Sequence, residues 1–314
     1  MSNLDLSVIV PLYNEEESVN PLFIAIDKVL KNLKLTYEII FVDDGSTDKM
    51  FENIEDLSHK NTHLKAIKFR ANYGQTPAMA AGIDYAQGDI LITMDGDLQN
   101  DPEDIPNFIK KINEGYDIVV GWRHKRQDKM ITRKIPSKIA NWLIGKVTGV
   151  PIKDNGCSLK AYRARVIKQV PLYSEMHRFI PAMASIAGAK IAEIKVRHHA
   201  RKFGESKYGL SRIFKVLSDL ISIKMIISFA SRPMIGFGVV SIIPFILSIM
   251  TFILGFIYKI NAPDGSIVIF LGSFLLLGSL SLFLIFSGML CEIIYKTGNV
   301  KLDRLSLKTT LKNN

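Results

Sequence analysis

The sequence predicts an α/β fold with a mostly parallel sheet, followed by a helical C-terminal part that is inserted in a membrane. Two features of the 314-residue chain lead to this prediction. Residues 1–120 alternate short apolar segments with longer amphipathic ones, and the last quarter holds two long runs almost free of charge. The first pattern is typical of strands that alternate with covering helices, and the second of membrane-spanning helices.

The expected strands are short apolar runs bounded by turn-forming residues. They cover residues 6–10, 38–42, 65–69, 90–94 and 118–121. Apolar residues recur at helical spacing over residues 19–33, and further helices are expected near 76–86 and 102–113. Asn14 is expected to cap the first helix, which would begin among residues 15–17. Because the strands are apolar on both faces, we expect a Rossmann-like, mostly parallel sheet.

The C-terminal part contains two apolar runs, Pro233 to Tyr258 and Ile267 to Tyr295. About 20 apolar residues cross the hydrocarbon core of a bilayer, so both runs are predicted to span the membrane as a hairpin. Residues 208–232 alternate apolar and charged residues, which predicts amphipathic juxtamembrane helices, although an ordinary packed surface helix shows the same pattern. The predicted parts are therefore 1–207, 208–232, 233–295 and a basic tail, 296–314.

Basic residues flank the hairpin on one side only. They are Lys224 and Arg232 before it, and Lys296, Lys301, Arg304, Lys308 and Lys312 after it. The loop between the spans carries one Lys and one Asp. The positive-inside rule therefore predicts a multi-pass protein of the plasma (inner) membrane with both termini and the N-terminal domain in the cytoplasm. The N-terminus lacks the basic and apolar regions of a signal peptide.

The formal net charge is +10, which favours anionic partners. Two basic stretches, residues 122–138 and 195–207, lie ahead of the membrane part. Either basic stretch, considered alone, could simply be a solvent-exposed loop. Nucleic acid is not an expected partner, because the basic residues are not interleaved with aromatic ones and no groove-reading motif is present. Their position beside apolar spans favours a lipid surface.

The motif that most strongly predicts chemistry follows the strand at 90–94. Asp95 and Asp97 are two residues apart, and Gln99 comes after them. At the carboxyl end of a strand, both carboxylates can face the crevice where open α/β sheets bind ligands. Their oxygens suit a hard cation such as Mg²⁺ or Mn²⁺, which would bridge two phosphates of a nucleoside diphosphate. A solvated acidic turn is the simpler alternative.

Two other strand ends would wall the same crevice. Asp43 and Asp44 follow the second strand, where an acidic side chain can accept hydrogen bonds from a ribose or a base edge. A turn with a helix cap would use the same residue types. Residues 11–15 follow the first strand. The glycine-rich loop of dinucleotide-binding folds and the P-loop are both absent there.

Four motifs in sequence order carry a resemblance to a known family. They are Val10–Glu15, Val42–Asp48, Arg70–Gln75 and Met94–Gln99, and the segments 178–181 and 201–209 extend them. Together they resemble family 2 glycosyltransferases. More narrowly, the chain looks like the polyprenyl-phosphate glycosyltransferases, the group of dolichyl-phosphate mannose synthase and the bacterial bactoprenol glucosyltransferases. With the two spans, the resemblance covers nearly the whole chain.

The resemblance implies a GT-A fold and a role for each matched residue. The residues implied to bind the nucleotide sugar are Pro11, Tyr13, Asn14, Glu15, Asp43, Asp44, Gly74, Gln75, Asp95 and Lys207. Asp95, Asp97 and Gln99 would hold the metal. The acceptor phosphate would be bound by Arg123, Arg133, Ser137 and Arg201. Asp154 would orient the acceptor or the sugar. Together with Asp97, these five residues are the expected catalytic residues. Guanidinium groups suit phosphate oxygens.

The implied reaction is an inverting transfer of a hexose, with UDP-glucose as the first choice of donor, to polyprenyl (undecaprenyl) phosphate. Mannose, N-acetylglucosamine and amino-arabinose donors stay open. One departure bears on the sugar: many relatives have an aromatic-Arg pair where this chain has Ser158, Leu159 and Lys160. A homo-oligomer is expected because membrane helices often pack with copies of themselves, and a downstream flippase or glycosyltransferase is a further expected partner.

Three other readings are weaker. A processive polysaccharide synthase would carry a Gln-x-x-Arg-Trp signature, which neither Trp122 nor Trp142 fits. A nucleotidyltransferase would need a glycine-rich loop after the first strand. A non-catalytic, membrane-tethered protein that binds nucleotide sugars would not need the intact acidic pair together with the basic groups.

Overall fold

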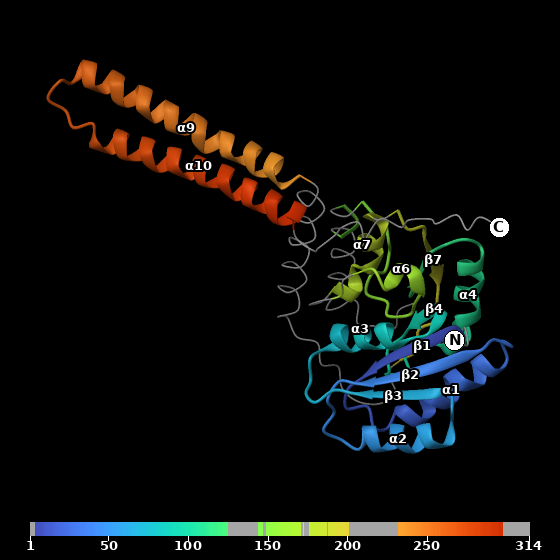
Figure 1. Cartoon of the computed structure of the whole chain (residues 1–314). Coiled ribbons are helices and arrows are strands. Elements are labelled where there is room, and N and C mark those ends of the chain that lie inside the picture. The colour runs from blue at the N-terminus through green and yellow to red at the C-terminus, as the bar shows by residue number, and fades with distance from the viewer. Residues whose placement is uncertain are drawn as a thin grey trace. The chain divides into compact units, whose positions relative to one another are not determined.

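A computed structural model of the chain describes residues 4–124, 144–146, 149–170, 172, 176–186, 188–200 and 232–297. These residues belong to two compact units, one formed by the described residues up to 200 and the other by residues 232–297 (Figure 1). Residues 201–231 and the tail from 298 lie outside the described residues. The predicted boundaries at 207 and 295, and the predicted juxtamembrane helices, therefore stay predictions.

The first unit is built on a seven-stranded mixed sheet with the order β3-β2-β1-β4-β6-β5-β7. The strands are β1 (Leu4–Leu12), β2 (Tyr37–Asp43), β3 (Leu64–Lys68), β4 (Gly88–Thr93), β5 (Ile118–Trp122), β6 (Lys160–Arg163) and β7 (Ile191–Lys195). All pairs are parallel except those of β6, which is antiparallel to both β4 and β5. The carboxyl ends of the other six strands therefore lie at one edge.

Helices cover both faces of this sheet. They are α1 (Val19–Lys31), α2 (Met50–Lys60), α3 (Gln75–Tyr85), η1 (Pro102–Asp104), α4 (Ile105–Asn113), α6 (Ala164–Ile167), η3 (Met176–Arg178) and α7 (Ile180–Ile186). Val8 and Val10 join the core that α1, α2 and α4 cover. Ile9 points to the other face, beneath α3, where a Cβ on Gly82 would lie 2.4 Å from the Ile9 side chain. The alternation of strand residues thus fills two apolar layers.

The sequence predictions for this unit are confirmed, with one correction and two additions. Each predicted strand and helix is present at the expected place. The predicted cap is wrong: α1 begins at Val19, and Asn14 adopts a left-handed conformation with φ of 51°. Its side chain accepts a hydrogen bond from Thr47 N–H instead. Strands β6 and β7 were not predicted, because short strands of mixed polarity carry little periodic signal.

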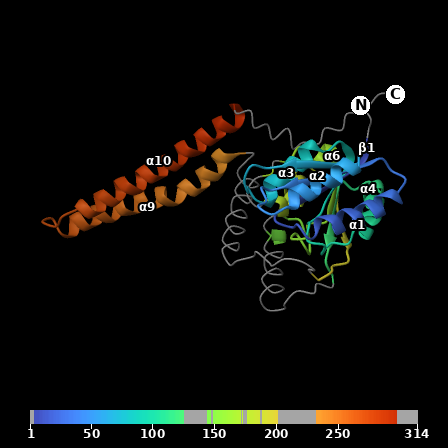
Figure 2. The same ribbon diagram turned by 90° about the horizontal axis from the view of Figure 1, so that it is seen from below.

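The second unit is a helical hairpin of α9 (Pro233–Asn261) and α10 (Val268–Thr297), which run side by side in Figures 1 and 2. Both helices are long and apolar enough to cross a membrane, with a mean hydropathy of 2.5 each. Small residues allow close contact. Ser248 Oγ donates to Phe274 O at 2.9 Å, and Ser281 Oγ donates to Ser241 O at 3.0 Å. Hydroxyl-to-carbonyl bonds of this kind join helices in lipid.

Candidate active site

The loops that follow β1, β2, β4 and β5 meet at the carboxyl edge of the sheet. The first two are tied by reciprocal bonds: Asn14 N–H donates to Ser46 Oγ at 2.9 Å, and Thr47 N–H donates to Asn14 Oδ1 at 2.9 Å. Asp43 lies fully buried beneath them, and its Oδ1 accepts a bond from Ser46 N–H at 2.8 Å. These contacts give the two loops one fixed arrangement.

The second oxygen of Asp43 is unusual. Asp43 Oδ2 is buried and has no hydrogen-bond partner among the described residues. A buried acceptor without a partner costs free energy, roughly 1–3 kcal/mol, and a bound ligand or water that supplies the donor is one explanation for it. This observation agrees with the predicted nucleotide contact of Asp43, which stays a prediction.

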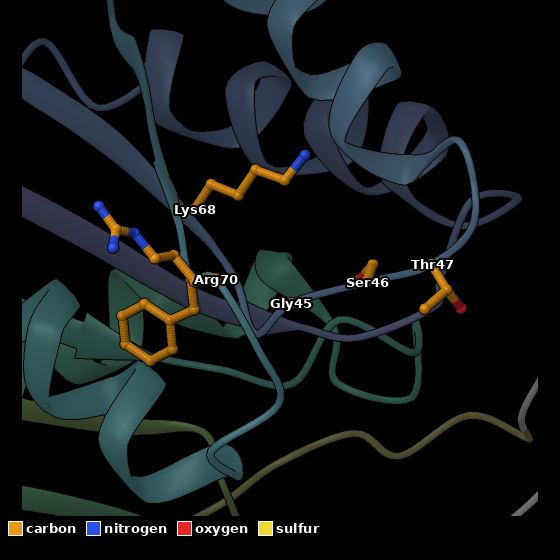
Figure 3. Close-up of a pocket in the computed structure, with 6 residues that line it drawn as sticks. Gly45, Ser46, Thr47, Lys68 and Arg70 are labelled. Atoms are coloured by element: carbon orange, nitrogen blue, oxygen red, sulfur yellow. The ribbon is translucent and has the colours of Figure 1, made fainter.

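An open hollow of about 340 Å³ lies between the loop after β2 and the residues at the end of β3. Its lining residues are Gly45, Ser46, Thr47, Lys68, Phe69 and Arg70 (Figure 3). Gly45 has φ of 72°, and a Cβ there would lie 2.4 Å from the Ala71 carbonyl carbon. Only glycine fits this conformation and this close approach, which lets the loop after β3 cross the loop after β2.

Asp44 fixes the loop that enters α3. Its two oxygens accept bonds from the backbone N–H groups of Tyr73 and Gly74, each at 2.8 Å. Burial raises the pKa of Asp44, although these two bonds act in the opposite direction. The next residue, Gln75, donates its Nε2–H to Asp95 Oδ1 at 2.7 Å. Asp44 and Gln75, both predicted to bind the nucleotide sugar, thus support the first carboxylate of the acidic pair.

Residues 95–100, called the acidic loop below, follow β4. Asp97 is 7% exposed, and its Oδ1 accepts a bond from Gln99 N–H at 3.2 Å. Gln99 Nε2–H donates to His199 O at 3.3 Å, and Asn100 Nδ2–H donates to Ser158 Oγ at 2.8 Å. The part of the chain that the structure describes contains no cluster of three or more His, Cys, Asp and Glu side chains able to hold a metal.

Arg123 follows β5 and pairs with Asp154. Its Nε and Nη2 donate to the two carboxylate oxygens at 2.7 and 2.9 Å. Burial opposes the guanidinium charge, but the bonds and charge of Asp154 outweigh it, so the pKa of Arg123 is raised. The charge of Asp95 acts in the same direction. The fork of Arg123 is therefore held in place on the same side of the crevice as the acidic loop.

Comparison with known proteins identifies the family. Residues 7–171, more than half of the chain, match the model of Glycosyl transferase family 2. The chain belongs to this family. It is 42% identical, over 95% of its length and 89% of the relative's, to a dodecaprenyl-phosphate galacturonate synthase of Rhizobium johnstonii. It is 37% identical, over 87% and 84%, to an undecaprenyl-phosphate 4-deoxy-4-formamido-L-arabinose transferase of Proteus mirabilis. The predicted family and enzyme class are confirmed.

The fold is shared with solved glycosyltransferases. A glucosyl-3-phosphoglycerate synthase of Mycobacterium tuberculosis, solved with Mn²⁺, UDP and phosphoglyceric acid, superimposes with a TM-score of 0.54. The match covers 71% of this chain and 78% of the other, at 16% identity. The GT-A fold predicted from the sequence is therefore confirmed, and the two apolar helices fit transmembrane helices.

Lys160 lies near the candidate active site of this family 2 glycosyltransferase, next to the ends of β4 and β5. The sequence did not predict a role for it. It is 2% exposed, and its Nζ donates to Asn155 O and His177 O, each at 3.1 Å. His177 Nδ1 in turn lies 2.7 Å from Thr76 Oγ1 at the start of α3. Burial lowers the pKa of Lys160 to about 8. These contacts join α3, β6 and η3 beneath the crevice.

Cys157 lies in the same buried layer. Burial raises the pKa of its thiol to about 12, so the thiol stays protonated at neutral pH and is not a nucleophile there.

Four predicted site residues fall on parts of this glycosyltransferase that the structure does not describe. They are Arg133, Ser137, Arg201 and Lys207. The remaining ones lie at the carboxyl edge of the sheet or in the loop beside β5. Pro11 differs from the other predicted site residues because it lies within a strand, β1, where it pairs with Val42 of β2.

Proposed function

We propose that this family 2 glycosyltransferase moves a sugar from a nucleoside diphosphate donor to the phosphate of a polyprenyl lipid such as undecaprenyl phosphate. The observation that carries the proposal is the set of strand ends that places Asp43, the acidic loop and the Arg123–Asp154 pair along one edge of the sheet. Two relatives act, by their names, on dodecaprenyl and undecaprenyl phosphates. Two spans would keep such an enzyme at the bilayer that holds its acceptor.

The nucleoside is proposed to occupy the hollow beside Gly45. Asp43 Oδ2 would accept a hydrogen bond from a base N–H or a ribose hydroxyl, which gives that buried oxygen its missing partner. Lys68 and Arg70 supply positive charge at the rim. The remaining residues of the predicted set, Tyr13 and Glu15, lie on the loop after β1 at the same edge.

Asp95 and Asp97 are proposed to hold a divalent metal, Mg²⁺ or Mn²⁺. Carboxylate oxygens are suitable ligands for either ion. Because two carboxylates leave most coordination positions open, the donor diphosphate and water would fill them, with Gln99 Oε1 as a further candidate. When bound, the metal stabilises the charge that grows on the departing nucleoside diphosphate. A solved glycosyltransferase of the same fold contains Mn²⁺ together with UDP, which supports this choice.

The acceptor phosphate is anionic at neutral pH and needs no strong base. Its oxygen is proposed to attack the anomeric carbon from the face opposite the leaving group, which inverts the configuration. Arg123 would bind the phosphate, and Asp154 would fix the guanidinium fork by its two bonds. Arg133, Ser137, Arg201 and Lys207 are proposed to contribute further contacts. The rate would come mainly from positioning and electrostatics.

The identity of the donor sugar is the most specific part of the proposal. Glucose from UDP-glucose was the sequence prediction. The curated relatives act, by name, on galacturonate and 4-deoxy-4-formamido-L-arabinose, so these donors stand beside glucose, mannose and N-acetylglucosamine. We also propose the plasma (inner) membrane location, the cytoplasmic catalytic unit, homo-oligomer formation and a downstream flippase or glycosyltransferase.

The test is a transfer assay with the purified full chain, undecaprenyl phosphate, Mn²⁺ or Mg²⁺ and a panel of labelled nucleotide sugars. Metal-dependent label in the organic phase from one donor supports the proposal and names the sugar. Asp97→Asn should lower turnover by roughly 100-fold while the protein stays folded, since it removes a charge that the metal needs. Near-normal turnover of Asp97→Asn would reject the metal assignment.

A further inference from the structure

The chain that leaves β7 lies directly against the acidic loop. This segment, Val196–His199, is called the brace below. His199 N–H donates to Gln99 O at 2.9 Å, and Gln99 Nε2–H donates back to His199 O at 3.3 Å. Asn100 and His198 form an antiparallel bridge beside them. Gln99 is therefore held through both its backbone and its side chain by one segment that is 100 positions away in the sequence.

Arg197 attaches the brace to the turn that follows the acidic loop. Its N–H donates to Asp104 Oδ2 at 2.8 Å, and its Nε lies 3.2 Å from both Asp104 Oδ1 and Asp101 Oδ2. Its Nη1 donates to Glu103 Oε2 at 2.9 Å. His199 Nε2 lies 3.1 Å from Asp101 Oδ2. Three acidic side chains around η1, those of Asp101, Glu103 and Asp104, thus converge on one guanidinium.

These contacts are expected to order the brace locally and to contribute little to the free energy of unfolding of the whole unit. The Arg197 side chain is 49% exposed, and exposed ion pairs contribute little, about 0–1 kcal/mol each. The Asp104 side chain is only 7% exposed, however, so its carboxylate needs the partner. Loss of the Arg197 side chain should therefore loosen the brace against η1 and leave the sheet intact, while the backbone N–H of residue 197 still bonds Asp104.

We propose that Arg197 is a positioning residue that fixes Gln99 and the acidic loop by holding the brace against η1. The inference rests on the proposed function, which assigns the metal to the acidic loop. Positioning groups of this kind change metal affinity by about 10- to 100-fold.

The test compares Arg197→Gln, Arg197→Lys and the control Arg163→Gln in the full-length protein. Arg163 is likewise a partly exposed arginine that faces a carboxylate, Asp117, but it pairs with Ile90 at the start of β4, away from the site. Hydrogen exchange is measured over residues 95–104 and 196–200. Mn²⁺ binding is followed by paramagnetic resonance, and the Mn²⁺ half-activation concentration by the transfer assay.

For Arg197→Gln we expect faster exchange in both segments, weaker Mn²⁺ binding and a roughly tenfold rise in the Mn²⁺ half-activation concentration. Arg197→Lys should recover part of each change, and Arg163→Gln should match the wild type. Unchanged exchange would overturn the proposal, and so would faster exchange with unchanged Mn²⁺ binding and kinetics. If wild-type protein transfers no sugar, the proposed function fails, whereas exchange and Mn²⁺ binding still test the brace.

Discussion

At the scale of single residues, the acidic pair depends on neighbours outside the acidic loop. Asp95 accepts a bond from Gln75, and Gln75 follows a loop whose backbone Asp44 holds. A hydrogen bond to one oxygen of a ligating carboxylate orients the other oxygen toward the metal. We therefore propose a supporting role for Asp44 and Gln75, and their nucleotide-binding role stays a prediction.

Gln75→Ala tests this relay. Without the amide, Asp95 loses its orienting donor, and we expect the Mn²⁺ concentration for half-maximal transfer to rise by about tenfold. The exposed Gln87, near the start of β4, gives the matched control Gln87→Ala, which should behave as wild type. An unchanged metal requirement in Gln75→Ala would remove Gln75 from the metal site.

Lys160 provides a pH-dependent prediction. Its pKa is lowered by burial to about 8, so between pH 8 and the ordinary lysine value the unfolded chain binds more protons than the folded one. This group therefore makes the fold more stable as the pH rises through that window. The penalty for its buried charge is fully present below about pH 8.

Lys160→Met removes this contribution. Relative to the variant, the wild-type protein should gain thermal stability between pH 8 and pH 10, measured by melting temperature in detergent. The exposed Lys60 supplies the control Lys60→Met, for which the difference from wild type should not depend on pH in this way. A constant difference for Lys160→Met would show that the buried ammonium does not titrate as described.

Sequence could predict the acidic pair because Asp95 and Asp97 are local: a strand and a spacing of two define them. It could not predict the Lys160 network or the brace. Thr76 and His177 are 101 positions apart, and Gln99 and His199 are 100 positions apart. Only the folded sheet brings the members of each pair together. The erroneous cap at Asn14 has the same cause, since its partner Thr47 belongs to another loop.

At the scale of elements, the insertion of β6 between β4 and β5 shapes the crevice. The antiparallel strand places Lys160 beside Thr93 and Val120, just before the acidic loop and Arg123. Thr93 Oγ1–H donates to Ser158 O at 2.8 Å, which fixes the loop ahead of β6. The parallel strands were predictable from their continuous apolar character, whereas the four residues of β6 are too few for a period to be visible.

The hairpin gives a prediction that uses its close contacts. A Cβ on Gly255 would lie 2.7 Å from Phe270, so Gly255→Leu should separate α9 from α10 there. Gly272→Leu is the control, because a Cβ at Gly272 meets nothing within 4 Å. The readout is disulfide formation in Ser248→Cys/Gly278→Cys with Cys157 and Cys291 changed to Ser, quantified by mass spectrometry.

A Cβ on Gly278 would lie 3.3 Å from Ser248 Oγ, which suits a disulfide. Gly255→Leu should lower its yield several-fold, and Gly272→Leu should not. Equal yields in both variants would mean that the contact at Gly255 does not set the distance between the two helices.

At the scale of the whole molecule, the orientation in the membrane is a prediction of charge placement. The turn between α9 and α10 should face away from the cytoplasm. In a chain without its native cysteines, Asp264→Cys should react in intact spheroplasts with a membrane-impermeant maleimide. Lys60→Cys, exposed in the catalytic unit, should react only after lysis. The opposite labelling pattern would mean that the protein has the reverse orientation in the membrane.

In the proposed reaction, a sugar without phosphate passes from the donor to the lipid. A transfer assay tests this with a donor that carries tritium in the sugar and a radioactive phosphate next to it, together with undecaprenyl phosphate and Mn²⁺. We expect tritium to enter the organic phase while the labelled phosphate stays with the released nucleotide in water. Transfer of both labels to the lipid would mean that the enzyme moves a sugar phosphate, and the proposed reaction would be wrong.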